Sequence, residues 1–110
     1  GLVIFVHGSG SSRLSPRNKQ VATALNQHHL ATLLFDLLTS EEEKIDNVTA
    51  EYRFNIDLLA SRLIGVTDWV RQTPMLEKFK IGYFGASTGA AAALIAAAMR
   101  SQAVSAVVSR

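Results

Sequence analysis

The sequence contains no cysteine among its 110 residues. This absence excludes a disulfide, a thiolate metal site and a cysteine nucleophile within this stretch of chain. The longest apolar runs are far shorter than the roughly 20 residues that a membrane-spanning helix needs. The formal net charge is only +2, and the basic residues are scattered rather than clustered. We therefore expect neither a membrane nor a nucleic acid as a partner, and no bound metal.

The two ends of the sequence lack the features of a leader and of polar tails. The opening residues, GLVIFVHG, have neither the basic region nor the cleavage site of a signal peptide, which predicts a cytoplasmic location. Apolar segments begin at Leu2 and reach Val108, whereas whole domains usually start and finish with exposed polar residues. We expect residues 1–110 to be one partial domain of a longer chain.

What the sequence does contain is a large apolar fraction. Hydrophobic residues make up 48% of the chain and charged residues 18%, a balance that predicts a folded core rather than disorder. Four apolar segments without alternation are typical of strands buried on both faces of a parallel sheet. These segments are residues 2–6, 31–36, 81–84 and 103–108.

Three segments between the strands predict helices, at residues 16–27, 50–72 and 88–99. Ser15 and Pro16 suit the N-cap and the first position of the first helix. The second helix has one apolar face, because apolar residues recur every three or four positions: Tyr52, Ile56, Leu59, Leu63, Val66 and Val70. The third is rich in alanine, the best helix former. Residues 37–47 are expected to form a polar loop.

Alternating strands and helices predict an α/β fold, a three-layer sandwich in which helices cover both faces of a parallel sheet. Ligands of such sheets bind at the edge formed by the carboxyl ends of the strands. Five polar or small residues are expected at this edge: His7, Gly8, Asp36, Gly85 and Ser87.

The motif Gly85-Ala86-Ser87-Thr88-Gly89 follows a strand and opens a helix. This context is typical of a nucleophile elbow, in which a tight turn lifts a serine above the sheet. Gly85 and Gly89 meet the need for small flanking residues, and the helix N-terminus favours developing negative charge. We predict that Ser87 is a catalytic nucleophile. The alternative is an ordinary strand-to-helix turn that Ser87 caps.

The loop His7-Gly8-Ser9-Gly10 follows the first strand at the same edge. Acyl-transfer enzymes hold the oxyanion of the tetrahedral intermediate with two N–H donors. We predict that the backbone amides of Ser9 and Thr88 are these donors, with Gly8 as the second choice in the loop. His7, Gly8 and Gly10 then shape the loop, and His7 has a structural role rather than that of a base.

The same loop also allows a dinucleotide-binding interpretation. Gly8-x-Gly10-x-x-Arg13 after a strand, with Asp36 after the next, imitates a dinucleotide fingerprint. The third glycine is missing, and the predicted helix start at Pro16 lies six residues beyond Gly10. A noncatalytic or dinucleotide-binding α/β module therefore stays open as the alternative function. The hydrolase, in contrast to a dinucleotide-binding module, is expected to need no cofactor.

Other conspicuous residues have plainer interpretations. His28 and His29 are expected at the opposite edge of the sheet, as surface residues. Glu41-Glu42-Glu43 suits a solvated loop, and Asn47-Val48-Thr49 fits a glycosylation sequon without other signs of secretion. Trp69, on the long helix, is expected to serve packing.

Together these segments resemble the α/β-hydrolase fold. LVIFVHGSGSS is similar to its oxyanion strand and loop, ATLLFDLL to the next strand, and IGYFGASTGAAAAL to its nucleophile elbow. FDLLTSEEE and RFNIDLLASRL make the chain most similar to dienelactone-hydrolase-like proteins. The resemblance implies a small-molecule acyl substrate, such as an ester, thioester or lactone, and a sheet with spatial strand order second, first, third, fourth. Some relatives are fused to a phosphoribosyltransferase domain, which this chain does not contain.

The chain departs from this family in two respects. Classical dienelactone hydrolases use a cysteine nucleophile, whereas this chain has Ser87 and no cysteine, so a serine esterase is the safer expectation. The resemblance also implies an acid and a histidine after the nucleophile, and no histidine follows Ser87. We therefore expect both groups, and the flanking strands, in the rest of the hydrolase chain, to which residues 1–110 are fused or bound. By themselves these residues are expected to be inactive.

Overall fold

A computed structural model describes residues 1–6, 16–34, 36, 38–49, 55–76, 78–85 and 88–109 of the chain. The elements in these ranges are the following, in chain order: β1 (Leu2–Val6), α1 (Pro16–Gln27), β2 (Ala31–Leu34), α2 (Ser40–Thr49), α3 (Ile56–Gln72), β3 (Ile81–Gly85), α4 (Thr88–Met99) and β4 (Val104–Ser109). All four predicted strands and all three predicted helices are present. The predicted α/β class is therefore confirmed.

The four strands form one parallel sheet with the order β2-β1-β3-β4. This order is the predicted one. The chain first steps outward from β1 to β2, and then crosses back over β1 to reach β3 and β4. Because such crossovers are right-handed, the helix of the first step lies on one face of the sheet and those of the later steps lie on the other.

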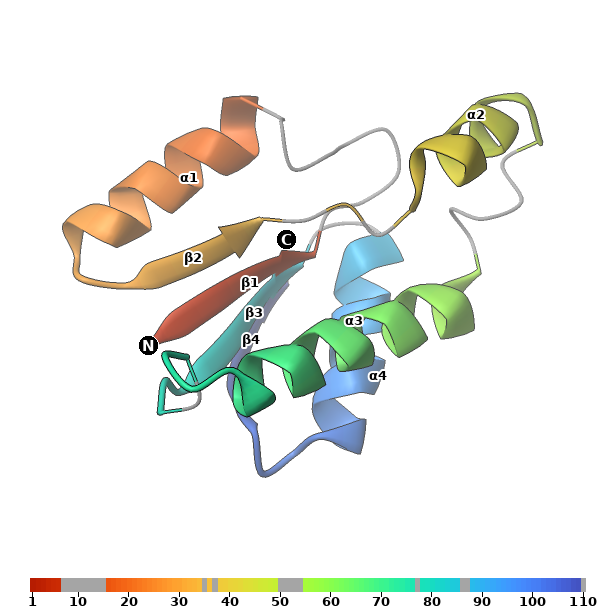
Figure 1. Ribbon diagram of the computed structural model, residues 1–110. Coiled ribbons are helices and arrows are strands. Elements are labelled where there is room, and N and C mark those ends of the chain that lie inside the picture. The colour runs from red at the N-terminus through yellow and green to blue at the C-terminus, as the bar shows by residue number, and fades with distance from the viewer. Residues whose placement is uncertain are drawn as a thin grey trace.

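Helices α1, α3 and α4 accordingly cover the two faces of the sheet. In Figure 1, α1 lies over β2 on one side, whereas α3 and α4 lie side by side across the other. The core lies between the sheet and this α3–α4 layer, and its side chains come from every second residue of the strands and from the inner faces of both helices. Its fully buried members include Ile4, Leu63, Val70, Tyr83 and Ala93.

The alanine-rich helix α4 packs closely on the sheet, as its composition predicts. Ala92, Ala93 and Ala96 are completely buried. Side chains of one carbon allow the helix backbone to approach the strands, which brings the N-terminus of α4 close to the end of β3.

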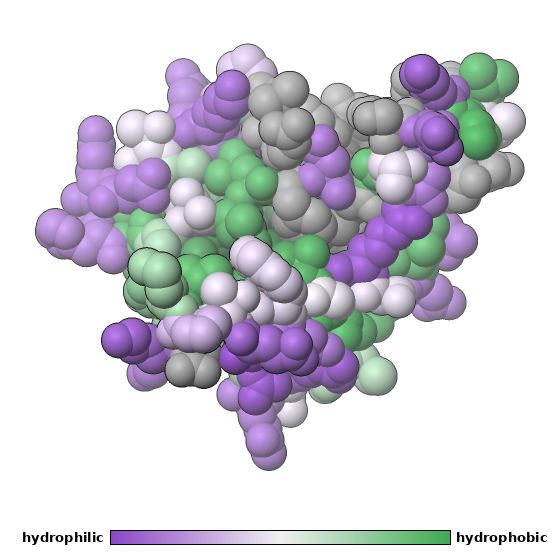
Figure 2. Space-filling model, viewed as in Figure 1, coloured by the Kyte–Doolittle hydropathy of each residue, from purple (hydrophilic) through white to green (hydrophobic). Residues whose placement is uncertain are grey.

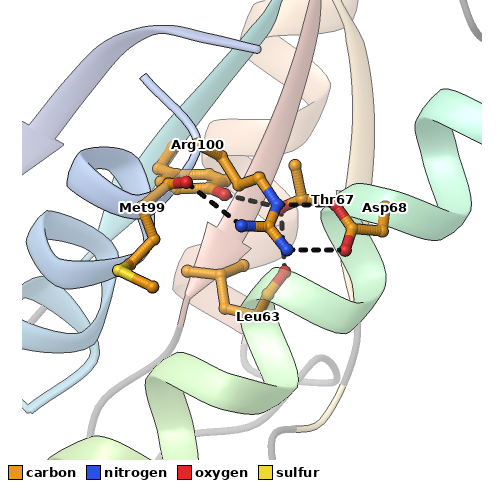
Figure 3. A network of polar contacts seen from close by, with 6 residues as sticks. Leu63, Thr67, Asp68, Met99 and Arg100 are labelled. Carbon is orange, nitrogen blue, oxygen red and sulfur yellow. Dashed lines mark hydrogen bonds and ion pairs between the residues drawn. The ribbon is translucent and has the colours of Figure 1, made fainter. Parts of the chain in front are cut away.

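A network of polar contacts joins the two helices of this layer (Figure 3). Arg100, just after α4, donates two hydrogen bonds to the carboxylate of Asp68 on α3, with lengths of 2.9 and 3.0 Å. Beneath them, the buried Thr67 hydroxyl donates to the carbonyl oxygen of Leu63 and contacts the Tyr83 hydroxyl at 2.5 Å. Burial raises the pKa of Tyr83. The network therefore fixes α3 against both α4 and β3.

The prediction of a polar loop at residues 37–47 is wrong, because α2 begins at Ser40. Thr39, just before the helix, and Glu42, in its first turn, form a capping box. The Glu42 N–H donates to the Thr39 hydroxyl at 3.2 Å, and the Thr39 N–H donates to the Glu42 carboxylate at 2.9 Å. The pattern Thr-x-x-Glu was therefore the sequence signal for a helix start.

Glu42 also ties α2 to α3 through a bidentate ion pair with Arg62, in which Nη2 and Oε2 are 2.6 Å apart. The hydrogen bonds from Arg62 and from the Thr39 N–H lower the pKa of Glu42 from 4.5 to about 2. The folded protein thus keeps this carboxylate ionised at a pH where the unfolded chain protonates it.

We expect the protein to lose stability as the pH falls from about 5 to about 2, because protonation of Glu42 removes both interactions. The sign follows from the lowered pKa: the contribution is complete above the unfolded pKa and disappears as the pH falls through the folded one. Urea unfolding across this pH range measures the loss of stability. The Glu42→Gln variant should be less stable than the unsubstituted protein near neutrality and should lose less stability on acidification. Equal losses of stability in both proteins would contradict the assignment of this pH dependence to Glu42.

The start of the long helix also differs from the prediction. The α3 helix begins at Ile56 rather than near residue 50, because Asn55 is its N-cap and accepts a hydrogen bond from the Leu58 N–H at 3.1 Å. Of the predicted apolar face, Leu59, Leu63 and Val70 are buried. Tyr52 lies outside the described residues.

Candidate functional site at the carboxyl edge of the sheet

The register of the central strands brings two predicted site segments to one place. Val6, the last residue of β1, pairs with Gly85, the last residue of β3. The last described residues before His7 and before Ala86 therefore lie side by side in the sheet. Thr88, half-buried, is the first residue of α4. The structure thus describes the strand and the helix on either side of the predicted elbow.

Gly85 is required at the end of β3 by close contact with α4. A Cβ at this position would lie 2.8 Å from Cα of Ala90 and 3.1 Å from the carbonyl oxygen of Gly89. Both obstacles are backbone atoms, so a side-chain rotation cannot relieve them. Gly89 is itself buried. The structure thus shows close packing of α4 against the end of β3, whereas the predicted turn itself, at residues 86 and 87, lies outside the described residues.

Several predicted site residues lie outside the described residues: His7, Gly8, Ser9, Gly10 and Ser87. The described residues locate the chain on either side of them, at Val6, Gly85 and Thr88. Asp36 is described, and it is exposed just beyond β2 at the same edge of the sheet.

His28 and His29 lie at the opposite edge, as predicted, and both are exposed. They belong to a Schellman motif that ends α1. The His29 N–H donates to the carbonyl oxygen of Asn26 at 3.1 Å, and the Leu30 N–H to that of Leu25 at 3.1 Å. His29 has a φ of 65°, which is the left-handed conformation that this motif demands.

We expect His29→Gly to stabilise the protein by about 1 kcal/mol, because glycine adopts a positive φ without steric strain. The free energy of unfolding in urea measures this gain. His28→Gly is the matched control, because it is the neighbouring residue without a positive φ, and it should destabilise. A loss of stability in His29→Gly would show that the histidine side chain has a role.

Within the described ranges, no three histidine, aspartate or glutamate side chains are grouped so that they could hold a metal ion. None of the described helices is long and apolar enough to cross a membrane.

The sequence did not predict the hollow beside α3. Asp36 and Arg62 line it together with Gly65, Val66 and Trp69. Trp69 was expected to serve packing, but 55% of its surface is exposed in the structure. A single sequence could not reveal this hollow, because it forms between α3 and Asp36, residues far apart in the chain.

Comparison with known proteins gives one solved structure and two curated relatives. No family model matches the chain. Two curated proteins of Mycobacterium tuberculosis, from different strains, are 56% identical over all 110 residues, and each is described as a "putative phosphoribosyl transferase". The chain covers all of its own length but only 24% of theirs.

The solved structure is that of a dienelactone hydrolase from Anabaena variabilis. It shares 63% sequence identity with this chain and superposes with a TM-score of 0.97. The match covers the whole of this chain and 51% of that one. The strand order and the helices on both faces of the sheet agree with this likeness. Over residues 1–110 the chain therefore has the α/β-hydrolase fold, in the form found in dienelactone hydrolases.

Proposed function

We propose that the protein containing this chain is a serine hydrolase that acts on an ester, thioester or lactone through Ser87. The single observation that carries the proposal is the approach of α4 to the end of β3 at Gly85, where a Cβ would lie 2.8 Å from Ala90. An ordinary strand-to-helix connection does not need so close an approach. A nucleophile elbow needs it, because the serine must stand above the sheet edge.

The backbone amides of Thr88 and Ser9 are our candidates for the oxyanion hole. Thr88 opens α4, and the first amides of a helix have no partner within the helix. The pairing of Val6 with Gly85 supports the choice of Ser9, because Ser9 follows Val6 by three residues in the sequence. Two such donors stabilise the negative oxygen of a tetrahedral intermediate, and each contributes about 3 kcal/mol to transition-state stabilisation.

The base and its acidic partner come from polypeptide outside residues 1–110 in this proposal. His28 and His29 are at the far edge, where they serve the end of α1. A serine hydroxyl is a poor nucleophile until a base within hydrogen-bond reach takes its proton. Residues 1–110 alone should therefore lack Ser87-dependent hydrolysis.

The name of the curated relatives suggests a different activity for those longer proteins. The chain spans about a quarter of their length, and we propose that phosphoribosyl transfer belongs to the remainder. The dinucleotide alternative receives little support, because α1 begins at Pro16, six residues beyond Gly10. A helix that holds a pyrophosphate begins directly after the glycine turn.

Labelling of the full-length protein with a fluorophosphonate tests the hydrolase proposal. The probe forms a covalent bond with an activated serine, so mass spectrometry of the digested protein should find the adduct on Ser87. Heat-denatured protein is the control, because its serine is no longer activated. An unlabelled Ser87 in folded protein would count against the proposal, and binding of a nicotinamide dinucleotide would favour the alternative.

A further inference from the structure

A hollow of about 340 Å³ lies on the flank of α3, between this helix and Asp36. Its lining on α3 includes Arg62, Val66 and Trp69, which recur at intervals of four and three residues and therefore share one face of the helix. Figure 2 shows hydrophobic surface between α1 and α3. The hollow thus combines apolar and charged side chains, a composition typical of sites for small molecules.

Trp69 is the aromatic wall of the hollow, and 55% of its surface is exposed. Gly65, one turn away on α3, also lines the hollow, and a Cβ at this position would meet no atom within 4 Å. The described residues therefore leave space beside the ring for a small molecule. An indole attracts a cation to its face more strongly than the other aromatic side chains do, because the face of its π system is negative.

The charges at the hollow favour a cation over an anion. Asp36 supplies one negative charge, and Arg62 supplies one positive charge. Both carboxylate oxygens of Glu42 accept hydrogen bonds from this guanidinium. The pair with Arg62 and the Thr39 N–H lower the pKa of Glu42 to about 2, so Glu42 is ionised at neutral pH. Two negative charges and one positive charge leave a formal net charge of −1 among these described side chains.

We propose that this hollow binds a small organic cation, such as a methylated ammonium group, between the ring of Trp69 and the carboxylate of Asp36. The apolar groups of the ligand pack on the ring and on Val66, and the carboxylate balances the positive charge. A bare metal ion fits less well, because it needs several oxygen or nitrogen ligands and an indole ring supplies none. The site does not involve Ser87, so its ligand can be tested separately from hydrolysis.

Binding of three molecules of similar shape to the full-length protein tests this proposal. Choline is the cation, the alcohol with carbon in place of its nitrogen is the neutral isostere, and tert-butylacetic acid, ionised at neutral pH, carries the opposite charge. Isothermal titration at constant ionic strength measures the dissociation constants. Choline should bind at least about 10-fold more tightly than the alcohol, and the anion should bind most weakly.

Three results of this titration would overturn the proposal. Equal affinity for choline and for the alcohol would mean that the hollow is merely apolar. Tighter binding of the anion would mean that Arg62 sets the preference. No measurable binding of choline would mean that the hollow is filled or absent in the full-length protein.

Variants identify the two groups that hold the cation. Trp69→Leu keeps an apolar side chain without a π face and should weaken choline binding about 10-fold, whereas Trp69→Phe should keep part of the affinity. Asp36→Asn should weaken choline binding about 5-fold and leave binding of the alcohol unchanged. Asp57→Asn, which changes an exposed carboxylate of α3 outside the lining of the hollow, is the matched control and should bind choline normally. Unchanged choline binding in Trp69→Leu and Asp36→Asn, with Tm values that show folded proteins, would place the ligand elsewhere and overturn the proposal.

Discussion

Ser87→Ala should reduce ester hydrolysis by the full-length protein by several orders of magnitude. The substitution removes the atom that would form the acyl-enzyme, so only the slower direct attack by water remains. The fold should persist, because alanine suits both the turn and the start of α4. The measurement is kcat/KM with a p-nitrophenyl acyl ester, together with the Tm of both proteins.

The control for this result is Ser61→Ala, which changes an exposed serine on α3. It should keep the activity of the unsubstituted protein. A Ser87→Ala variant with normal turnover would remove the basis of the proposed function. A variant that loses activity and also unfolds would point to a structural role for the serine.

Gly85→Ala should have the second largest effect, because it places a Cβ 2.8 Å from Cα of Ala90. Helix α4 must then move away from β3. Overpacking of this kind costs about 1–3 kcal/mol of stability. The movement would also displace Ser87 and Thr88 from the loop after β1, and a displacement of about 1 Å can lower activity about 100-fold. Urea unfolding and kcat/KM measure the two effects.

Gly82→Ala is the matched control, in the same strand. A Cβ at Gly82 would lie 3.6 Å from the carbonyl oxygen of Ala106, which is ordinary contact. This variant should be close to the unsubstituted protein in both measurements. Equal effects of the two substitutions would mean that any side chain in β3 is disruptive, and that the turn at Gly85 has no special tightness.

The strands and helices were largely predictable because their signals are local. The apolar segments predicted β1, β2, β3 and β4 to within two residues, and α4 begins at Thr88 and ends at Met99 as predicted. Short connections and right-handed crossovers then limit the possible topologies, whereas the strand order itself was inferred from the family resemblance. The α2 helix was missed because its signal, the capping box of Thr39 and Glu42, was outweighed by the charge of the segment.

The candidate site was predictable in part. The motif from Gly85 to Gly89 indicated a tight turn that needs small residues, and the structure leaves no room for a Cβ at Gly85. The roles of Ser87 and of the Ser9 amide stay predictions, because these residues lie outside the described part of the chain. The hollow beside α3 could not be predicted, because it depends on how α3 lies relative to Asp36.

The sequence by itself determined which segments form strands and helices, and that glycine and small residues flank Ser87. These properties depend on periodicity, propensity and neighbouring residues along the chain. Only the tertiary structure decided that Val6 and Gly85 are partners, that Glu42 reaches Arg62, and that Trp69 lies exposed beside Gly65. Those relations join residues far apart in the chain, or depend on space left between elements, and the packing of helices on the sheet sets both.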